Sequence, residues 1–104
     1  MGTWHEVSCI TTANRNDPQE QITYIGGHNA KGRGWRLSIA EAIDGMISGK
    51  WSFFVNVNGQ RHALVVAVSR RGSRFVKTEF DSAEPMTLLN LPHCAGVLAA
   101  DEFV

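Results

Sequence analysis

Apolar residues recur at helical spacing over residues 38–48, where positions 39, 42, 43, 46 and 47 share one face. Ser38 followed three residues later by Glu41 has the spacing of a capping box. Gly49 stands where a glycine commonly ends a helix. The pattern predicts one amphipathic helix that packs by its apolar face onto a flat partner.

Alternating apolar and polar residues then follow in two stretches, 51–57 and 60–69, on either side of Asn58-Gly59. This dipeptide favours a type I′ turn, which needs positive φ at both central residues. The spacing predicts a β-hairpin, and counting outward from a two-residue turn pairs Val55 with His62. The apolar face of the hairpin is the flat partner that the helix requires.

Further strands are predicted on both sides of this hairpin. A second hairpin has its turn at 70–73 and its returning strand at 74–79. Upstream, residues 6–12 and 21–25 also have strand-like composition. Residues 26–34 hold four glycines in nine positions and are predicted to form a mobile loop.

The order strand, strand, helix and three strands predicts an α+β fold. We expect a single, mainly antiparallel sheet of about five strands, with one principal helix packed on one face. The length of 104 residues, with 43% apolar and 19% charged residues, fits one globular domain over 1–104. Residues 95–104 are predicted to form a short helix or a tail.

No apolar run approaches the roughly 18 residues that a membrane span needs. The first residues lack the profile of a secretion signal, so we expect a soluble, cytoplasmic protein without a membrane partner. In that compartment Cys9 and Cys94 are predicted to be free thiols, although a contact between them at the sheet stays open. No C-x-x-C or H-x-x-x-H spacing occurs, and we expect neither metal nor cofactor.

Basic residues are concentrated in one part of the chain, although ten basic and ten acidic side chains cancel overall. Nine of the ten basic residues lie between Lys31 and Lys77, a stretch whose only acids are Glu41 and Asp44. Such a block marks either a surface that meets nucleic acid or a strand layer whose charges are answered by acidic segments in the fold.

The first hypothesis is therefore nucleic-acid binding with weak, salt-sensitive affinity. Arginines neutralise phosphates and an exposed indole stacks on a base, so a loop and a hairpin at one sheet edge could grip a single strand. The competing interpretation is that the indole covers the end of the core and the arginines keep a hairpin tip soluble. The candidate residues are Arg33, Trp35 and Arg36 in the loop, and Arg70, Arg71 and Arg74 at the second hairpin.

Two other hypotheses come from different classes of function. One is a small-molecule pocket or minor enzyme near His62, Lys77 and Asp81, where an imidazole, an amine and a carboxylate could transfer protons. The other is a protein-interaction or homodimerising module, because aromatic side chains and an exposed sheet edge could build an interface. No nucleophile elbow, phosphate loop or dinucleotide fingerprint is present, so we expect a binding domain rather than an enzyme.

Short motifs spread over most of the chain form one further pattern. They are Cys9-Ile10, Asn16-Asp17-Pro18, Ile22, Ile25-Gly26-Gly27, Trp35, Ala42-Ile43, Gly49, Phe53-Phe54-Val55, Phe75-Val76-Lys77-Thr78, Asp81 and Leu88-Leu89-Asn90-Leu91-Pro92-His93-Cys94. In order and approximate spacing they resemble the small bacterial proteins of domain of unknown function 3892. The resemblance covers roughly residues 7–94 and departs over the last ten. It implies a whole single domain, and it transfers no catalytic residue because that family has no assigned activity.

Overall fold

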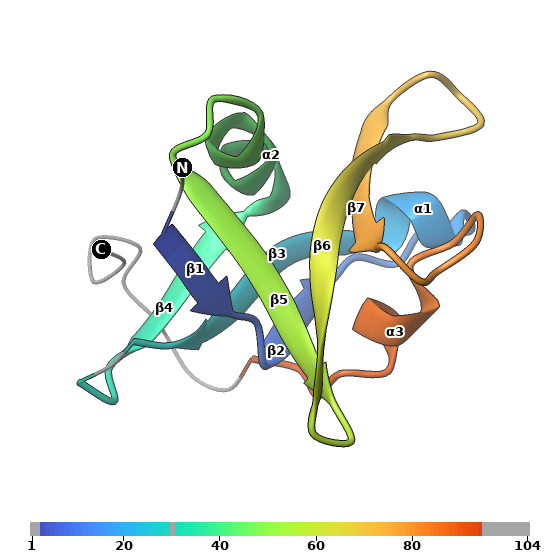
Figure 1. Cartoon of the computed structure of the whole chain (residues 1–104). Helices are drawn as coiled ribbons and strands as arrows, with labels where there is room; N and C mark the ends of the chain where they lie inside the picture. The colour runs from blue at the N-terminus through green and yellow to red at the C-terminus, as the bar shows by residue number, and fades with distance from the viewer. Residues whose placement is uncertain (1–2, 30, 95–104) are drawn as a thin grey trace.

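The computed structural model describes residues 3–29 and 31–94, which form two sheets and three helices (Figure 1). The tail predicted for 95–104 lies outside the described residues. The strands are β1 (Thr3–Glu6), β2 (Cys9–Thr12), β3 (Ile22–His28), β4 (Gly34–Ser38), β5 (Trp51–Val57), β6 (Gln60–Val68) and β7 (Arg74–Thr78). The helices are α1 (Pro18–Gln21), α2 (Ile39–Ile47) and α3 (Met86–Leu89).

The predicted helix is confirmed as α2, with both ends at the expected residues. The Ser38 hydroxyl accepts a hydrogen bond from the Glu41 amide at 3.2 Å, and the Glu41 carboxylate accepts one from the Ser38 amide at 3.3 Å. Gly49 follows the helix with a φ of +78°. Local sequence alone therefore determines where this helix begins and ends.

The first predicted hairpin is confirmed as β5–β6. Asn58 and Gly59 have φ values of 53° and 86°, as a type I′ turn requires. Val55 is paired with His62, as the count outward from the turn predicts. The second hairpin is confirmed as β6–β7, and Gly72 in its turn has a φ of +84°.

The α+β class is confirmed, but the expectation of a single sheet is wrong. One sheet has the order β1–β5–β6–β7, with β1 parallel to β5, and the other is the antiparallel sheet β2–β3–β4. The strand predicted over 6–12 is divided between them. The Val7 amide donates to the Phe54 carbonyl in the first sheet, and the next amide, of Ser8, donates to the Gly26 carbonyl in the second.

The expectation of a mobile loop over 26–34 is also wrong. Gly26 and Gly27 belong to β3, and Gly34 begins β4, so only residues 29–33 connect these two strands. A Cβ on Gly27 would collide with the Glu6 carbonyl, and one on Gly26 would lie 2.8 Å from the Trp35 carbonyl. These glycines permit close backbone packing, which a count of glycines cannot distinguish from flexibility.

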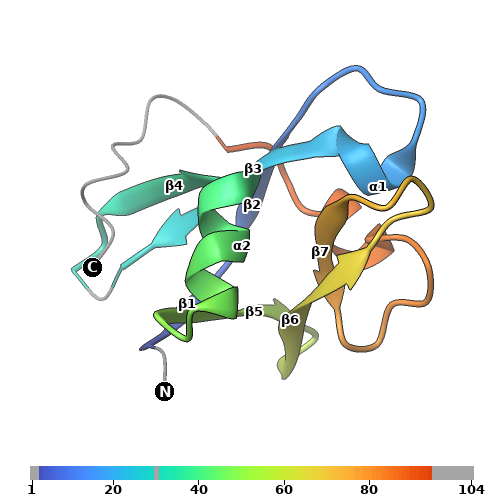
Figure 2. The ribbon, with the colours of Figure 1, turned by 90° about the horizontal axis from the view of Figure 1, so that it is seen from above.

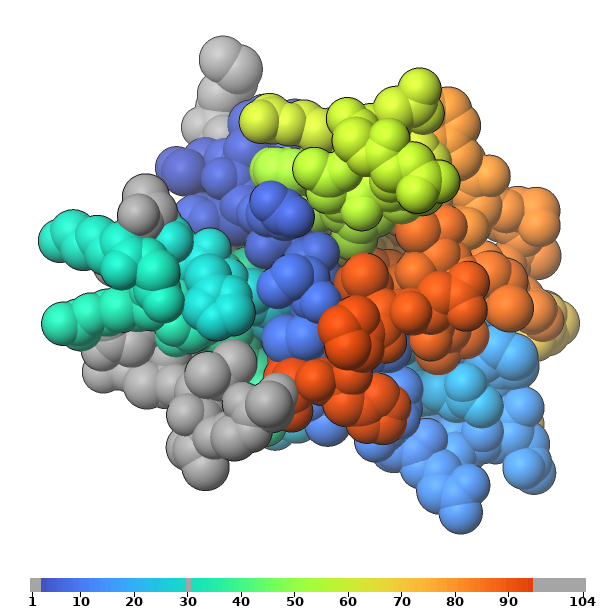
Figure 3. Space-filling model, turned by 90° about the horizontal axis from the view of Figure 1, so that it is seen from below, coloured from blue at the N-terminus to red at the C-terminus, as the bar shows by residue number. Residues whose placement is uncertain are grey.

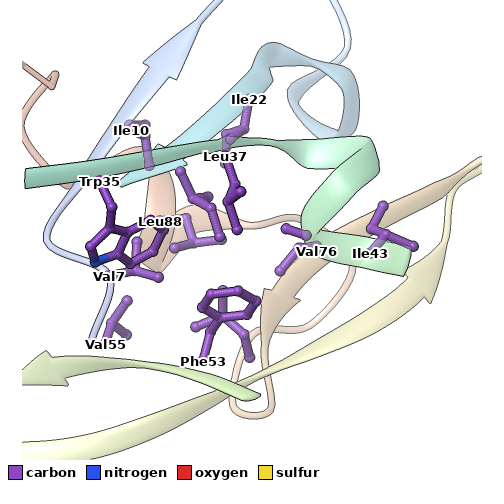
Figure 4. Packing of buried hydrophobic residues seen from close by; sticks show 13 residues of the cluster. Val7, Ile10, Ile22, Trp35, Leu37, Ile43, Phe53, Val55, Val76 and Leu88 are labelled. Carbon is purple, nitrogen blue, oxygen red and sulfur yellow. The ribbon is translucent and has the colours of Figure 1, made fainter. Parts of the chain in front are cut away.

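The two sheets enclose one cluster of buried apolar side chains (Figure 4). Figure 2 shows α2 lying over the space between the sheets on the upper side. Seen from below, the segment around α3 covers part of the opposite side (Figure 3). The helix therefore contacts strands of both sheets, including β3 and β5, instead of one face of a single sheet.

The prediction of free thiols is wrong in this structure, because Cys9 and Cys94 form a disulfide. Residue 93 pairs in parallel with Ile10, which brings the two cysteine Cα atoms to 4.8 Å. The cysteines are 85 residues apart in sequence, so only the tertiary fold places them together. Closing a loop of that length restricts the unfolded chain and stabilises the fold by about 2–4 kcal/mol.

We predict that Gly45→Ala destabilises the protein, although alanine ordinarily stabilises a helix interior by about 1 kcal/mol relative to glycine. Gly45 is buried in α2, and a Cβ there would collide with the six-membered ring of Trp51. The expected loss is about 1–3 kcal/mol in the free energy of unfolding, measured by urea denaturation. The control Asp44→Ala, on the exposed side of the same helix, should change stability by less than about 0.5 kcal/mol. A stabilising Gly45→Ala would show that the helix shifts away from Trp51 without cost.

Candidate functional site

The basic loop and the basic hairpin proposed for nucleic acid do not share a sheet edge. Residues 29–33 connect β3 and β4 in the three-stranded sheet, whereas residues 69–73 connect β6 and β7 in the four-stranded sheet. The two turns lie at opposite ends of the molecule in both Figure 1 and Figure 2. One strand of nucleic acid therefore cannot contact both turns as a single compact surface.

Trp35 cannot stack on a nucleic-acid base in this conformation, so the stacking role assigned to it is wrong. Its side chain is 0% exposed and points into the core cluster beside Val7 (Figure 4). Its ring centroid lies 5.9 Å from that of Phe53. Alternation along β4 sends Trp35 inward and Arg36 outward, where the Arg36 guanidinium lies 4.4 Å from the Tyr24 ring centroid.

Arg33 lies in the exposed connection between β3 and β4. Its amide donates to the Asn29 side chain at 3.0 Å, and that side chain also accepts from the Lys31 amide. This Asn29-centred turn determines the backbone of the loop. Residues 31 and 33 of this connection are therefore joined by hydrogen bonds to one side chain.

Two of the three hairpin arginines are neutralised by acidic groups from elsewhere in the chain. The Arg70 guanidinium lies 2.7 Å from the Asp17 carboxylate and 3.6 Å from that of Glu84. The Arg71 guanidinium lies 3.9 Å from the Glu20 carboxylate. Acidic residues of the flanking segments thus form ion pairs with part of the basic block. These ion pairs reduce the net positive charge that the hairpin presents to a polyanion.

The fold does not bring His62, Lys77 and Asp81 together as a catalytic group. The His62 ring packs on Phe80 at a centroid distance of 4.6 Å. Lys77 donates to the backbone carbonyl of Asp81 at 2.9 Å, and the Asp81 carboxylate accepts from the Thr78 amide and from both the amide and hydroxyl of Thr87. Asp81 thus organises the turn between β7 and α3, and its acceptor capacity is used structurally.

A half-open cavity of about 390 Å³ lies between α1, β3, the start of α2 and the β6–β7 hairpin. We call it the α1–β7 cavity. This volume lies at the lower end of the roughly 300–1,000 Å³ typical of small-molecule sites. Its apolar lining comes from several elements that also contribute to the core: Ile22, Ile39, Phe75, Val76 and Pro85.

The polar lining of the α1–β7 cavity is dominated by two arginines, Arg15 and Arg74. Both side chains are exposed, and within residues 3–29 and 31–94 neither guanidinium has an ion pair. The carboxylate of Glu20 also lines the cavity but lies beside Arg71. Ser38 at the start of α2 also lines the cavity, but its amide and hydroxyl already donate to the Glu41 carboxylate. The charged part of the lining therefore consists of two arginines and one glutamate.

A buried glutamine holds the walls of this cavity in place. The Gln19 side-chain amide donates to the Ala83 carbonyl at 2.6 Å, and its oxygen accepts from the Arg70 amide at 3.0 Å. It therefore ties α1 both to the β6–β7 hairpin and to the segment before α3. Gln19 is only 7% exposed, although its two partners lie at the surface.

Sequence reasoning missed Arg15 as a site residue because it is the one basic residue outside the basic block. It also missed Gln19, whose role depends on partners more than 50 residues away. One local signal was present: Asp17 caps α1, accepting from the Gln19 amide at 3.0 Å, with Pro18 at the first helical position. That cap predicts a short helix, but it does not predict what the helix packs against.

The comparisons with known proteins agree with the resemblance read from the sequence. The model of the family described as protein of unknown function, DUF3892, matches residues 6–92, and the chain therefore belongs to this family. No curated protein and no solved structure matches the chain. Within the described residues, no helix is long and apolar enough to cross a membrane, and no three His, Cys, Asp or Glu side chains gather where a metal could bind.

His5 on β1 is a titratable group at the edge of the core. Its ring lies 6.1 Å from both the Trp35 and Phe53 ring centroids. Burial lowers the pKa of His5 below its ordinary value of 6.5, because the charged imidazolium loses hydration. Protonation therefore favours the unfolded chain, in which the histidine is hydrated.

We predict that His5 makes the protein less stable in mild acid. The stabilisation is fully present above about pH 6.5 and is lost as the pH falls through the folded pKa, because the unfolded chain then binds more protons. Urea midpoints at pH 7.5 and 5.5 should differ less in His5→Gln than in the wild-type chain. His28→Gln, at the exposed end of β3, should keep the wild-type difference. Equal pH dependence in His5→Gln and the wild-type chain would contradict this assignment.

Proposed function

We propose that this protein is a ligand-binding domain whose α1–β7 cavity holds a small organic anion. The observation that carries the proposal is the pair Arg15 and Arg74, which line the cavity and have no ion pair among the described residues. Guanidinium groups match the geometry of phosphate and carboxylate, and two of them can hold the same anion. An anion would supply the charge that these arginines do not receive from the protein.

The remaining walls of the cavity favour an organic group attached to the anion. Ile39 and Ala40 line the cavity and keep part of their apolar surface exposed, beside the buried Phe75 and Pro85. A ligand with an apolar body would cover that exposed surface and exclude water from the arginine–anion contact. A phosphate or carboxylate on a ring or short chain therefore fits better than an inorganic ion.

Nucleic acid remains a second source of the same phosphate chemistry. Of the residues proposed to contact nucleic acid, the arginines at 33, 70, 71 and 74 are exposed. Three observations nevertheless make nucleic-acid binding the weaker candidate. Trp35 is buried, the loop and the hairpin are at opposite ends, and Arg70 and Arg71 have acidic partners. Binding of an oligonucleotide through the cavity arginines alone would be limited to one phosphate at a time.

The protein-partner hypothesis also stays a prediction. Large apolar side chains are exposed on separate segments, and none of them lines the α1–β7 cavity. The most exposed are Val68 and Phe80, each at 69%. These positions offer contacts to a partner, but no described contact indicates which partner would cover them.

We predict that phenyl phosphate binds in the α1–β7 cavity and that Arg15→Gln and Arg74→Gln each weaken it by roughly tenfold or more, as loss of a hydrogen bond to a charged group does. Amide chemical shifts of the full chain, followed through a titration, should change around Thr23, Ser38 and Ser73. Inorganic phosphate should bind more weakly, because it leaves the apolar wall uncovered.

The matched control is Arg61→Gln, which removes the same charge from outside the cavity, where the Arg61 guanidinium lies 4.6 Å from the Phe54 ring centroid. It should bind phenyl phosphate like the wild-type chain. Equal weakening in Arg61→Gln, or no shift changes at the cavity, would contradict the proposal. A single-stranded oligonucleotide that binds more tightly than phenyl phosphate, and loses affinity in Arg70→Glu/Arg71→Glu, would support the nucleic-acid hypothesis instead.

A further inference from the structure

The last described residues, 92–94, form an extended segment along the free edge of β2, which we call the strap. The Ile10 amide donates to the Pro92 carbonyl at 3.0 Å, and the Cys94 amide donates to the Ile10 carbonyl at 2.9 Å. His93 pairs with Ile10 in parallel. Figure 3 shows this end of the coloured chain beside the blue N-terminal strands. The strap is therefore attached to the edge of the three-stranded sheet by an isolated β-bridge.

The strap is held differently from the segment that precedes it. Leu88 of α3 is 0% exposed, and Leu91 packs against the core, so the chain is anchored just before the strap begins. Pro92 and His93 are exposed, and they contribute no side chain to the core. Two backbone hydrogen bonds and the Cys9–Cys94 disulfide are what fasten the strap to β2.

The disulfide lies on the outer face of the three-stranded sheet. Its neighbour Ile10 points the other way, into the core, because successive residues of a strand alternate. Both cysteines are half-buried, and a Cβ on Gly26 would lie 2.9 Å from the Cys94 Sγ. The two sulfurs thus lie over a position without a side chain and outside the core cluster.

We propose that the Cys9–Cys94 disulfide is a redox latch that controls the strap. A dithiol reductant attacks one sulfur, the Cys9–Cys94 bond breaks, and both cysteines become thiols as the reductant forms its own disulfide. Two electrons and two protons pass from the dithiol to the protein. The strap then leaves β2, and the amide and carbonyl of Ile10 lose their partners and face solvent.

A comparison of the conformational entropy of the strap with its hydrogen bonds explains why reduction would open it. Fixing the backbone of residues 92–94 costs more conformational entropy than two net backbone hydrogen bonds return. The disulfide removes most of that cost by keeping residue 94 beside residue 9. The core cluster includes Leu88 but no residue of the strap, so opening leaves the packed interior in place. The latch is independent of the proposed anion site, since no strap residue lines the α1–β7 cavity.

The test is amide hydrogen exchange on the full chain, first oxidised and then reduced with dithiothreitol. Reduction should accelerate exchange at Ile10 and Cys94 by about tenfold or more, as expected when a segment opens locally. Amides in the β5–β6 ladder should exchange somewhat faster but remain protected, because their exchange requires global unfolding, which loss of the cross-link favours without opening the core. Removing the reductant and reoxidising should restore slow exchange at Ile10 and Cys94.

In the variant Cys9→Ser/Cys94→Ser, the amide of Ile10 should exchange as fast as in the reduced chain, and dithiothreitol should not change that rate. In His93→Ala, exchange should respond to dithiothreitol as it does in the wild-type chain. Unchanged protection at Ile10 after reduction would overturn the latch, because the strap would then be held by packing. Loss of protection throughout the chain, in the reduced protein or in the double variant, would overturn it as well, because the disulfide would then be a staple of the whole fold. Two free thiols that resist oxidation would also exclude it.

Discussion

Close backbone packing at Gly26 and Gly27 is the constraint on which the rest of the structure depends. A side chain on Gly27 would collide with the Glu6 carbonyl, where β1 ends and the chain crosses from one sheet to the other. A side chain on Gly26 would displace both the Trp35 carbonyl and the disulfide sulfurs. Because these two positions carry no Cβ, the sheets can approach closely enough to enclose Trp35.

Charge in this protein divides into groups that hold the fold and groups that the fold leaves available. Arg70 and Arg71 contact acidic side chains of the segments that pack against their hairpin. Exposed ion pairs of this kind contribute little stability individually, and the hydrogen bonds of the buried Gln19 also connect the hairpin to α1. Arg15 and Arg74, which lie nearby, have no such partner among the described residues. A charge count along the sequence cannot make this division, since it depends on tertiary contacts.

What could be predicted from the sequence is what short-range physics determines. The capping box of α2 and the Asn58-Gly59 turn involve residues within four positions of one another, and both were predicted correctly. The second sheet, the disulfide and the burial of Trp35 could not be, because each depends on contacts between distant residues. Glycines that permit close packing have the same composition as glycines in loops, which explains the wrong prediction for 26–34. Of the candidate site residues, Arg74 alone lies at the α1–β7 cavity.

The construction of the cavity also bears on how specific its ligand can be. Its walls come from α1, β3, α2 and the β6–β7 hairpin, and Gln19 joins two of these segments through hydrogen bonds. Walls that are tied to the core do not rearrange freely, so the fold determines where the backbones of Arg15 and Arg74 stand. Both arginine side chains are exposed, however, and an anion would have to order their guanidinium groups at a cost in side-chain entropy. If the proposed organic anion binds here, its selectivity would therefore come from the apolar wall more than from a fixed geometry of the guanidinium groups.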